Sequence, residues 1–207
     1  MSHETQAPQT AGYVIHWARW YDLLHRIPFM RAIREKLVEL AAPAPGEHVL
    51  DVGCGTGALA IALKSRMGAG TVHGIDASPE MIEVAKGKAT RARSELELQV
   101  AVVEELPFPD ASFDLVTSSL VLHHLPEDLK RKGLAQVRRV LKPGGRFMAV
   151  DFVAHGHSPF SHLLAVFGHA RGASTVDTLT PMLKEAGFRD VEAISTRHKS
   201  FAFIRSR

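Results

Sequence analysis

The apolar positions along this chain alternate between two spacings. Short, nearly continuous apolar runs are typical of strands buried on both faces, and the longer stretches between them repeat apolar residues as one face of a helix does. The short runs predict strands over residues 48–52, 71–75, 96–102, 113–118 and 146–152. The longer stretches predict helices over residues 57–67, 78–93 and 127–141. This alternation predicts βαβ units and a mostly parallel sheet with helices on both faces.

The pattern is less regular at both ends of the chain. Residues 1–12 are polar and lack periodicity, so we expect a flexible lead-in. Apolar and aromatic residues recur at helical spacing on either side of Pro28, which predicts helices over residues 14–27 and 29–42. After residue 152 the pattern predicts helices over 159–168 and 175–186 and final strands over 188–194 and 200–204. We expect one domain over residues 13–207, made of a helical lid (13–44), a core (45–152) and a C-terminal part of the sheet (153–207).

The composition fits one buried domain and argues against several other classes of protein. The chain has 207 residues, 45% of them apolar, and a single cysteine, Cys54. One cysteine forms neither an intrachain disulfide nor a multi-cysteine zinc site, which favours a reducing compartment. The net charge of +3 is spread along the chain without a clustered basic face, so no nucleic-acid partner is expected. No apolar run is long enough to cross a bilayer and the first residues do not resemble a signal peptide, so we expect a cytoplasmic protein. The sequence carries no metal-binding motif, so we expect no metal site.

The turn that follows the first predicted strand carries the clearest chemical pattern. Residues 49–57 read VLDVGCGTG, an apolar strand that runs into three alternating glycines, Gly53, Gly55 and Gly57. Glycines allow a sharp turn and a close approach of the backbone to a ligand. The spacing is G-x-G-x-G rather than the G-x-G-x-x-G of dinucleotide-binding proteins, and Asp51 lies just before it. A carboxylate at this position suits a ligand with a cationic amine better than one with phosphates.

A second carboxylate ends the next predicted strand. Asp76 closes the run TVHGID, roughly twenty residues beyond the glycine loop, where a Rossmann-type sheet places a carboxylate that binds ribose. With the glycine loop, this arrangement resembles the class I S-adenosylmethionine-dependent methyltransferases. The resemblance continues in EELPFPDASFDLV (104–116), LHHLP (122–126) and RVLKPGGR (139–146), and spans about residues 45–152. Within the class, the chain is most similar to the type 11 branch, which includes the ubiquinone and menaquinone biosynthesis methyltransferases.

The resemblance implies a fold and a cofactor. The fold would be a Rossmann-like, doubly wound, seven-stranded, mostly parallel sheet with an antiparallel last strand and an N-terminal helical lid. The cofactor would be S-adenosyl-L-methionine, with S-adenosyl-L-homocysteine as product. The cofactor-binding residues would be Tyr21, Asp51, Gly53, Cys54, Gly55, Gly57, Asp76, Ala77, Met81, Val103, Glu104 and Ser119.

These residues divide among the parts of the cofactor. Asp51 would contact the amine, directly or through water, or would fix the glycine loop, and Asp76 would bind the ribose hydroxyls or cap its turn. Ser119 would lie beside the methionine portion.

At the adenine end the chain departs from the family. Val102 stands where the family usually has an aspartate, so the ring would be recognised by the backbone of Val103 or the carboxylate of Glu104. Ala77 and Met81 would cover the ring, although Met81 also fits an ordinary helix core.

Histidines supply the candidate bases. His123 and His124 follow the fourth strand, and either could act as a base near pH 7 or could pack against or cap the next helix. His25 is the third candidate.

The predicted N-terminal helices carry aromatic residues together with Arg19, Arg26, Arg31 and Arg34. They fit a lid over an apolar acceptor or an interfacial helix on anionic lipid.

Three functional hypotheses follow. The first is a methyltransferase that acts on a small apolar or aromatic acceptor. The second is a phospholipid N-methyltransferase at the membrane surface. The third is a cofactor-binding regulator or partner subunit without turnover. A nucleotide-dependent oxidoreductase is disfavoured by the glycine spacing.

Overall fold

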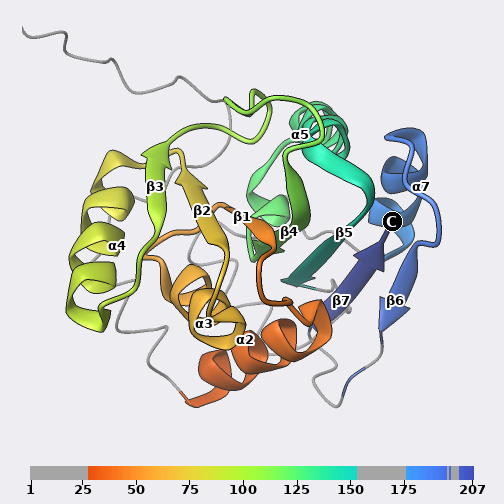
Figure 1. The fold of residues 1–207 in the computed structure, drawn as a ribbon. Helices are drawn as coiled ribbons and strands as arrows, with labels where there is room; N and C mark the ends of the chain where they lie inside the picture. The colour runs from red at the N-terminus through yellow and green to blue at the C-terminus, as the bar shows by residue number, and fades with distance from the viewer. Residues whose placement is uncertain (1–27, 153–175, 195, 197–200) are drawn as a thin grey trace, which may run out of the picture.

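The sheet and its flanking helices are seen in a computed structural model that describes residues 28–152, 176–194, 196 and 201–207 (Figure 1). The strands are β1 (His48–Val52), β2 (Thr71–Asp76), β3 (Glu97–Val100), β4 (Phe113–Ser119), β5 (Leu141–Phe152), β6 (Glu192–Ile194) and β7 (Phe201–Ser206). The helices are α2 (Pro28–Ala41), α3 (Ala58–Met67), α4 (Pro79–Ala92), the 3₁₀ turn η1 (Leu122–His124), α5 (Glu127–Val140) and α7 (Val176–Glu185). The helices predicted over 14–27 and 159–168 lie outside the described residues.

The strand order confirms the predicted fold class. The seven strands form one sheet in the order β3-β2-β1-β4-β5-β7-β6. Strands β1 to β5 pair in parallel, and β7 is antiparallel to both β5 and β6. The order reverses direction between β1 and β4, which is the switch point where such sheets bind ligands at the carboxyl ends of their strands.

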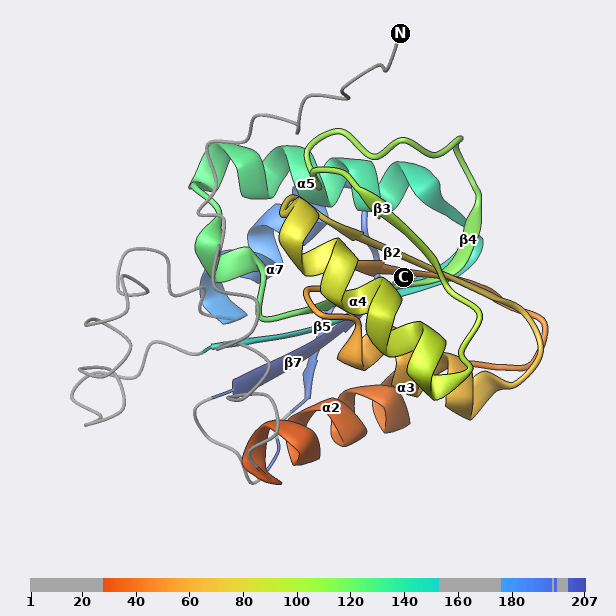
Figure 2. The ribbon, with the colours of Figure 1, turned by 90° about the vertical axis from the view of Figure 1, so that its left-hand side faces the viewer.

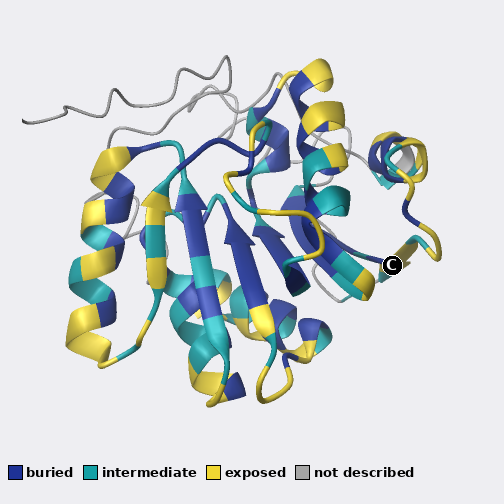
Figure 3. Cartoon of the chain, turned by 45° about the horizontal axis from the view of Figure 1, so that its top comes forward, coloured by how far each residue is buried: buried dark blue, intermediate teal, exposed yellow. Residues whose placement is uncertain are grey.

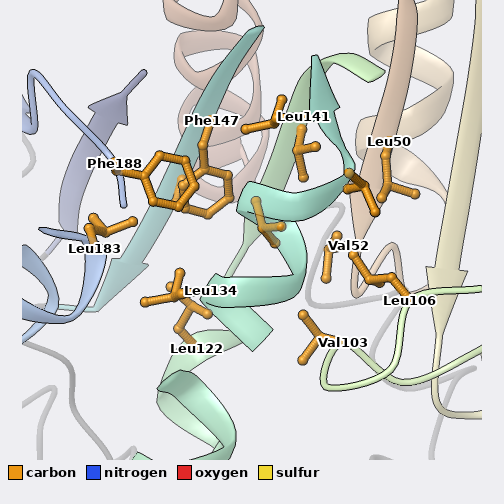
Figure 4. Packing of buried hydrophobic residues seen from close by; sticks show 14 of the residues in the cluster. Leu50, Val52, Val103, Leu106, Leu122, Leu134, Leu141, Phe147, Leu183 and Phe188 are labelled. Carbon is orange, nitrogen blue, oxygen red and sulfur yellow. The ribbon is translucent and has the colours of Figure 1, made fainter. Parts of the chain in front are cut away.

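The helices cover both faces of the sheet. Figure 2 shows α5 and α7 on one side, and α2 and α3 on the other. The first face is packed by an apolar cluster that includes Phe147 and Phe188, whose ring centroids are 5.8 Å apart, together with Leu134 of α5 (Figure 4). The second face is packed by α2 and α3 through Leu37 and Leu63. The central strands are therefore buried on both sides, which is why they read as continuous apolar runs (Figure 3).

Three predicted boundaries are wrong because strand pairing or a helix cap, rather than local pattern, decides where a strand begins and ends. β3 ends at Val100, after which the backbone turns. β5 begins at Leu141, because Leu141 pairs with Phe113 before a register shift absorbs the Pro-Gly-Gly turn. β6 begins only at Glu192, because Gly187 (φ +90°) and the buried Phe188 close the end of α7 through backbone hydrogen bonds.

Helix α2 is fixed to the sheet at its C-terminal end. The guanidinium of Arg146, on β5, donates to the carbonyl oxygens of Ala41 and Ala42 at 2.9 Å each. It also forms a bidentate pair with Glu47 at 2.7 and 2.9 Å. These bonds satisfy carbonyl groups that the helix end leaves without partners and fix the direction of α2 along the sheet.

Candidate functional site

The glycine loop takes a backbone conformation that only glycine adopts easily. Gly53, Gly55 and Gly57 have φ angles of +67°, +52° and +79°. A Cβ added at Gly53 would lie 2.3 Å from Cγ2 of Val121, the residue before η1. The glycines therefore let the loop after β1 turn tightly beside η1, with Gly57 at the N-cap of α3. The loop presents backbone groups and the positive end of α3 at the carboxyl edge of the sheet.

Asp51 is a buried carboxyl group at the switch point. The residue is 1% exposed, and its Oδ1 accepts a 2.9 Å hydrogen bond from the hydroxyl of Thr117 on the neighbouring strand β4. Its Oδ2 is buried with no hydrogen-bond partner among the described residues. Burial raises the pKa of the Asp51 carboxyl to about 7, opposed by the Thr117 hydroxyl and assisted by the charge of Asp76. A cation beside Oδ2 would satisfy this group.

Asp76 connects the glycine loop to the start of α4. One carboxylate oxygen accepts from the backbone N–H of Gly55 and the other from that of Ser78, at 2.9 Å each. Burial raises the pKa of the Asp76 carboxyl, and these two hydrogen bonds oppose the rise. Ser78 in turn caps α4 by accepting from the N–H of Met81 at 3.3 Å. The turn-fixing role is thus present, and each oxygen keeps a second lone pair for a ligand hydroxyl.

A cavity of about 30 Å³ lies between the glycine loop, β4 and α2. It brings together five residues that the sequence predicted for one site: Asp51, Gly53, Cys54, Gly55 and Ser119. It also brings in residues that the sequence did not predict there, including Met30, Ile33 and Arg34 of α2. Their spacing of three and four places them on one side of a helix, but the pattern does not say which pocket that side covers.

Cys54 lines this cavity but is mostly buried beside Gly74, and burial raises the pKa of its thiol, which fits a small packing residue rather than a reactive one. Other predicted cofactor residues lie outside the cavity lining. Met81 is 2% exposed in the core under α4. Val103 is also buried, and its side chain packs closely against Gly133 of α5. Ala77 and Glu104 are half-buried, and Tyr21 and His25 lie outside the described residues.

A histidine and an aspartate meet at the same edge of the sheet. Nδ1 of His123 lies 2.6 Å from Oδ1 of Asp151, and the backbone N–H of His123 donates to Oδ2 at 3.0 Å. Both side chains are 2% exposed. The carboxylate is an acceptor, so the bond assigns the ring proton to Nδ1 and makes Nε2 the basic nitrogen. The His124 ring lies against that of His123, with centroids 3.9 Å apart and the ring planes tilted by 40°.

The path from β4 into η1 is strained. Leu120 has a φ of +59°, a conformation that costs a residue with a Cβ about 1 kcal/mol or more. Its N–H donates to the carbonyl of Val150 on β5 at 2.9 Å, which anchors the turn. This turn sends the chain sideways into η1, so that His123 meets Asp151. Sequence reasoning missed Asp151, although its place at the end of a predicted strand was a usable sign.

The described residues contain no helix long and apolar enough to cross a membrane. Within the same residues no group of three or more His, Cys, Asp or Glu side chains is placed to hold a metal ion.

Comparison with known proteins identifies relatives of this chain. A family model described as a methyltransferase domain matches residues 49–145. The chain is 37% identical to the O-methyltransferase cnsE of Penicillium expansum, over 90% of this chain and 69% of the relative. It is 35% identical to the ubiquinone/menaquinone biosynthesis C-methyltransferase UbiE of Geotalea daltonii, over 69% of this chain and 63% of that protein. A solved SAM-dependent methyltransferase from Aquifex aeolicus has the same fold, with a TM-score of 0.70 and 24% identity over 84% of this chain and 88% of that one.

Proposed function

Because the chain belongs to the class I S-adenosylmethionine-dependent methyltransferases, in the type 11 branch, we propose that it methylates a small aromatic or otherwise apolar acceptor. The observation that carries this proposal is the meeting of two sites at one edge of the sheet. One is the cavity with the buried Asp51 carboxyl, and the other is the His123–Asp151 pair. The first suits a cofactor with a cationic amine, and the second suits removal of a proton from an acceptor.

The residues around the cavity fit S-adenosylmethionine. Oδ2 of Asp51 has no hydrogen-bond partner among the described residues, and a buried carboxylate of this kind is stabilised by a ligand cation such as the amine of the methionine portion. Gly53 and Gly55 line the cavity without a side chain, Gly57 is the N-cap of α3, and Cys54 and Ser119 complete the wall. Asp76 would bind the ribose hydroxyls while it holds the loop.

The adenine end is proposed from the neighbouring turns. Ala77 and Met81 would cover the ring, and the backbone of Val103 with the carboxylate of Glu104 would recognise its edge. Tyr21 is proposed to close the site from the segment outside the described residues.

S-adenosylmethionine supplies a methyl group already activated by its sulfonium, so the chain needs to hold the acceptor in line, exclude water and, for some acceptors, take a proton. We propose that Nε2 of His123 takes the proton of the acceptor, because Asp151 holds the ring proton on Nδ1 and stabilises the imidazolium that forms. The pair acts on an acceptor hydroxyl or an acidic C–H. His124, whose ring lies against that of His123, and His25 are the other candidate bases.

The acceptor class draws support from the relatives. One is an O-methyltransferase, and another is a C-methyltransferase of ubiquinone and menaquinone biosynthesis. Hydroxylated aromatic and quinone-like molecules offer both a hydroxyl and a carbon whose protons a histidine can remove. The phospholipid and non-catalytic alternatives gain no specific observation, since the proposed lipid contact depends largely on residues 14–27, outside the described residues.

Two measurements test the proposal. Titration calorimetry with S-adenosylhomocysteine should show binding to the unmodified protein, weakened by about 1–3 kcal/mol in Asp76→Ala, because charge-assisted hydrogen bonds to the ribose are lost. Transfer of a labelled methyl group to a panel of phenols and hydroxyquinones should then identify an acceptor.

In His123→Gln and Asp151→Asn we expect transfer to fall about 10²-fold or more while binding of S-adenosylhomocysteine stays intact. Equal transfer by His123→Gln and the unmodified protein, at every pH from 6 to 9, would remove His123 as the base. Loss in His124→Gln instead would move the role to its neighbour.

A further inference from the structure

A lysine is buried near the start of helix α5. Lys130 is 7% exposed, although lysine is among the residues least often buried. Gly133 and Leu134, three and four positions further on, are buried with it, so the packing of α5 fixes the side of the helix on which Lys130 lies. Neither burial nor the positive end of the helix dipole favours a cation here, so an ammonium at this position needs negative charge close by.

Asp151 supplies that negative charge. Burial lowers the pKa of the Lys130 ammonium, and the charges of Asp151 and then of Glu127 oppose the shift. Glu127 pairs with Arg131 at 2.8 Å and its side chain is 67% exposed, so solvent screens its charge. The side chain of Asp151 is 2% exposed. Among the described residues, the buried negative charge that acts on Lys130 is therefore that of Asp151.

The same carboxylate holds the ring of His123. Its Oδ1 accepts from Nδ1 of His123 at 2.6 Å and from the backbone N–H of Phe152 at 2.8 Å. Its Oδ2 accepts from the backbone N–H of His123 at 3.0 Å. Within the described part of the chain, the titratable groups that meet at this point are Asp151 from β5, His123 and His124 from η1, and Lys130 and Glu127 from α5. Lys130 and His123 thus share one carboxylate.

The balance of charge among these groups depends on Lys130. With a neutral His123 ring, the charges of Lys130 and Asp151 cancel. A proton on the ring leaves one net positive charge where both His123 and Asp151 are 2% exposed, and a net charge away from water is costly. Without Lys130, a proton on the ring would instead cancel the charge of Asp151. Lys130 therefore favours the neutral ring, which is the form that accepts a proton.

We propose that Lys130 is a positioning residue that acts through Asp151 to keep His123 neutral near pH 7, so that Nε2 can accept the proton of the acceptor. The proposal rests on the proposed function, in which His123 is the base. A base that already holds a proton at the working pH contributes nothing, and a buried histidine beside an unbalanced carboxylate is prone to hold one. Lys130 needs no contact with the acceptor for this effect, because its charge acts on the carboxylate that orients the ring.

The test follows the protonation of His123 itself. Carbon NMR signals of the histidine rings, with that of His123 assigned by its loss in His123→Gln, give the pH at which the ring is half-protonated. In Lys130→Met, which keeps an unbranched side chain in the packing of α5, we expect this midpoint to rise by about one pH unit or more. Lys130→Arg keeps the charge and should keep the midpoint of the unmodified protein. Lys132→Met is the matched control on the exposed side of the same helix, and its midpoint should not move.

A second background tests whether Asp151 carries the effect. In Asp151→Asn, the further change Lys130→Met should move the midpoint less than it does in the unmodified protein, because the shared carboxylate is gone. An equal change in both backgrounds would mean that Lys130 does not act through Asp151, and an unmoved midpoint in Lys130→Met would mean that it does not act on the ring. Each result overturns the proposal.

Methyl transfer to an acceptor should show the same shift. In Lys130→Met, the acid limb of the kcat/KM profile should move to higher pH by the same amount as the NMR midpoint, while the Kd of S-adenosylhomocysteine stays unchanged. A rate that is lower at every pH with an unmoved profile would give Lys130 a purely structural role, and a rise in KM alone would make it an acceptor contact, so either result overturns the proposal. Full transfer by His123→Gln would instead remove the proposed base, and this role of Lys130 would fail with it even if the NMR midpoint had moved.

Discussion

The buried carboxyl group of Asp51 should make both stability and cofactor binding depend on pH. Its pKa is about 7 in the folded protein against an ordinary 3.8. Because the folded state holds this proton more tightly, the unfolded state binds fewer protons between these two values, and stability falls as pH rises through the window. A difference of about three pKa units corresponds to about 4 kcal/mol at pH 8, once the folded carboxyl has ionised. The raised pKa of Asp76 acts in the same direction.

Asp51→Asn isolates this contribution, because asparagine has the same shape and stays neutral. We expect the free energy of unfolding of the variant, measured by urea titration, to gain on that of the unmodified protein from pH 5 to pH 8. Because only about two of these three pKa units lie above pH 5, the gain over this range should be about 2.6 kcal/mol, to an order of magnitude, if no ligand is present. Subtracting the two curves removes the contribution that Asp76 makes to both proteins.

Binding of the cofactor should favour the ionised form of Asp51 over the protonated form. A cationic amine beside Asp51 favours the ionised carboxyl, so binding of S-adenosylhomocysteine releases protons near neutral pH and weakens as pH falls below about 7. Calorimetry in buffers of different ionisation enthalpy should give about half a proton released at pH 7 by the unmodified protein, and less in Asp51→Asn. Parallel stability curves for the two proteins, together with equal proton release, would refute the reasoning.

Three further predictions concern the parts that hold the site. Gly53→Ala should destabilise the protein by about 1–3 kcal/mol in urea unfolding, because its Cβ would meet a valine side chain at 2.3 Å. Gly144 also has a positive φ but nothing within 4 Å of its Cβ position, so Gly144→Ala should lower the free energy of unfolding by no more than about 1 kcal/mol. Arg146→Met should cost about 2 kcal/mol or more, because it removes a half-buried bidentate pair and the cap of α2, whereas Arg205→Met breaks an exposed pair and should cost under about 1 kcal/mol. Cys54 should react with a disulfide reagent slowly at neutral pH and rapidly in urea, since burial raises the pKa of its thiol; equal rates in the two conditions would contradict its burial.

The sequence predicted the fold through local patterns that have one structural solution. The glycine loop and the cap at Ser78 follow from backbone freedom and from a side chain that accepts a nearby N–H, and both formed where expected. The ends of several strands did not follow, because a strand extends only where a neighbour supplies hydrogen bonds. β5 was therefore extended to Leu141 by its pairing with β4.

Some residues of the candidate site could likewise be predicted from the sequence, and others could not. The sequence by itself determined Asp51, the glycines and Asp76 as a group, because each lies at a strand end and parallel strands deliver their carboxyl ends to one edge. Only the tertiary structure decided which distant residues join them. Asp151 reaches His123 through the strained turn at Leu120, and Arg34 reaches the cavity because α2 packs on the sheet in one orientation. Local spacing specifies which face of an element is apolar, but the partner of that face is set by long-range packing, which no short stretch of sequence encodes.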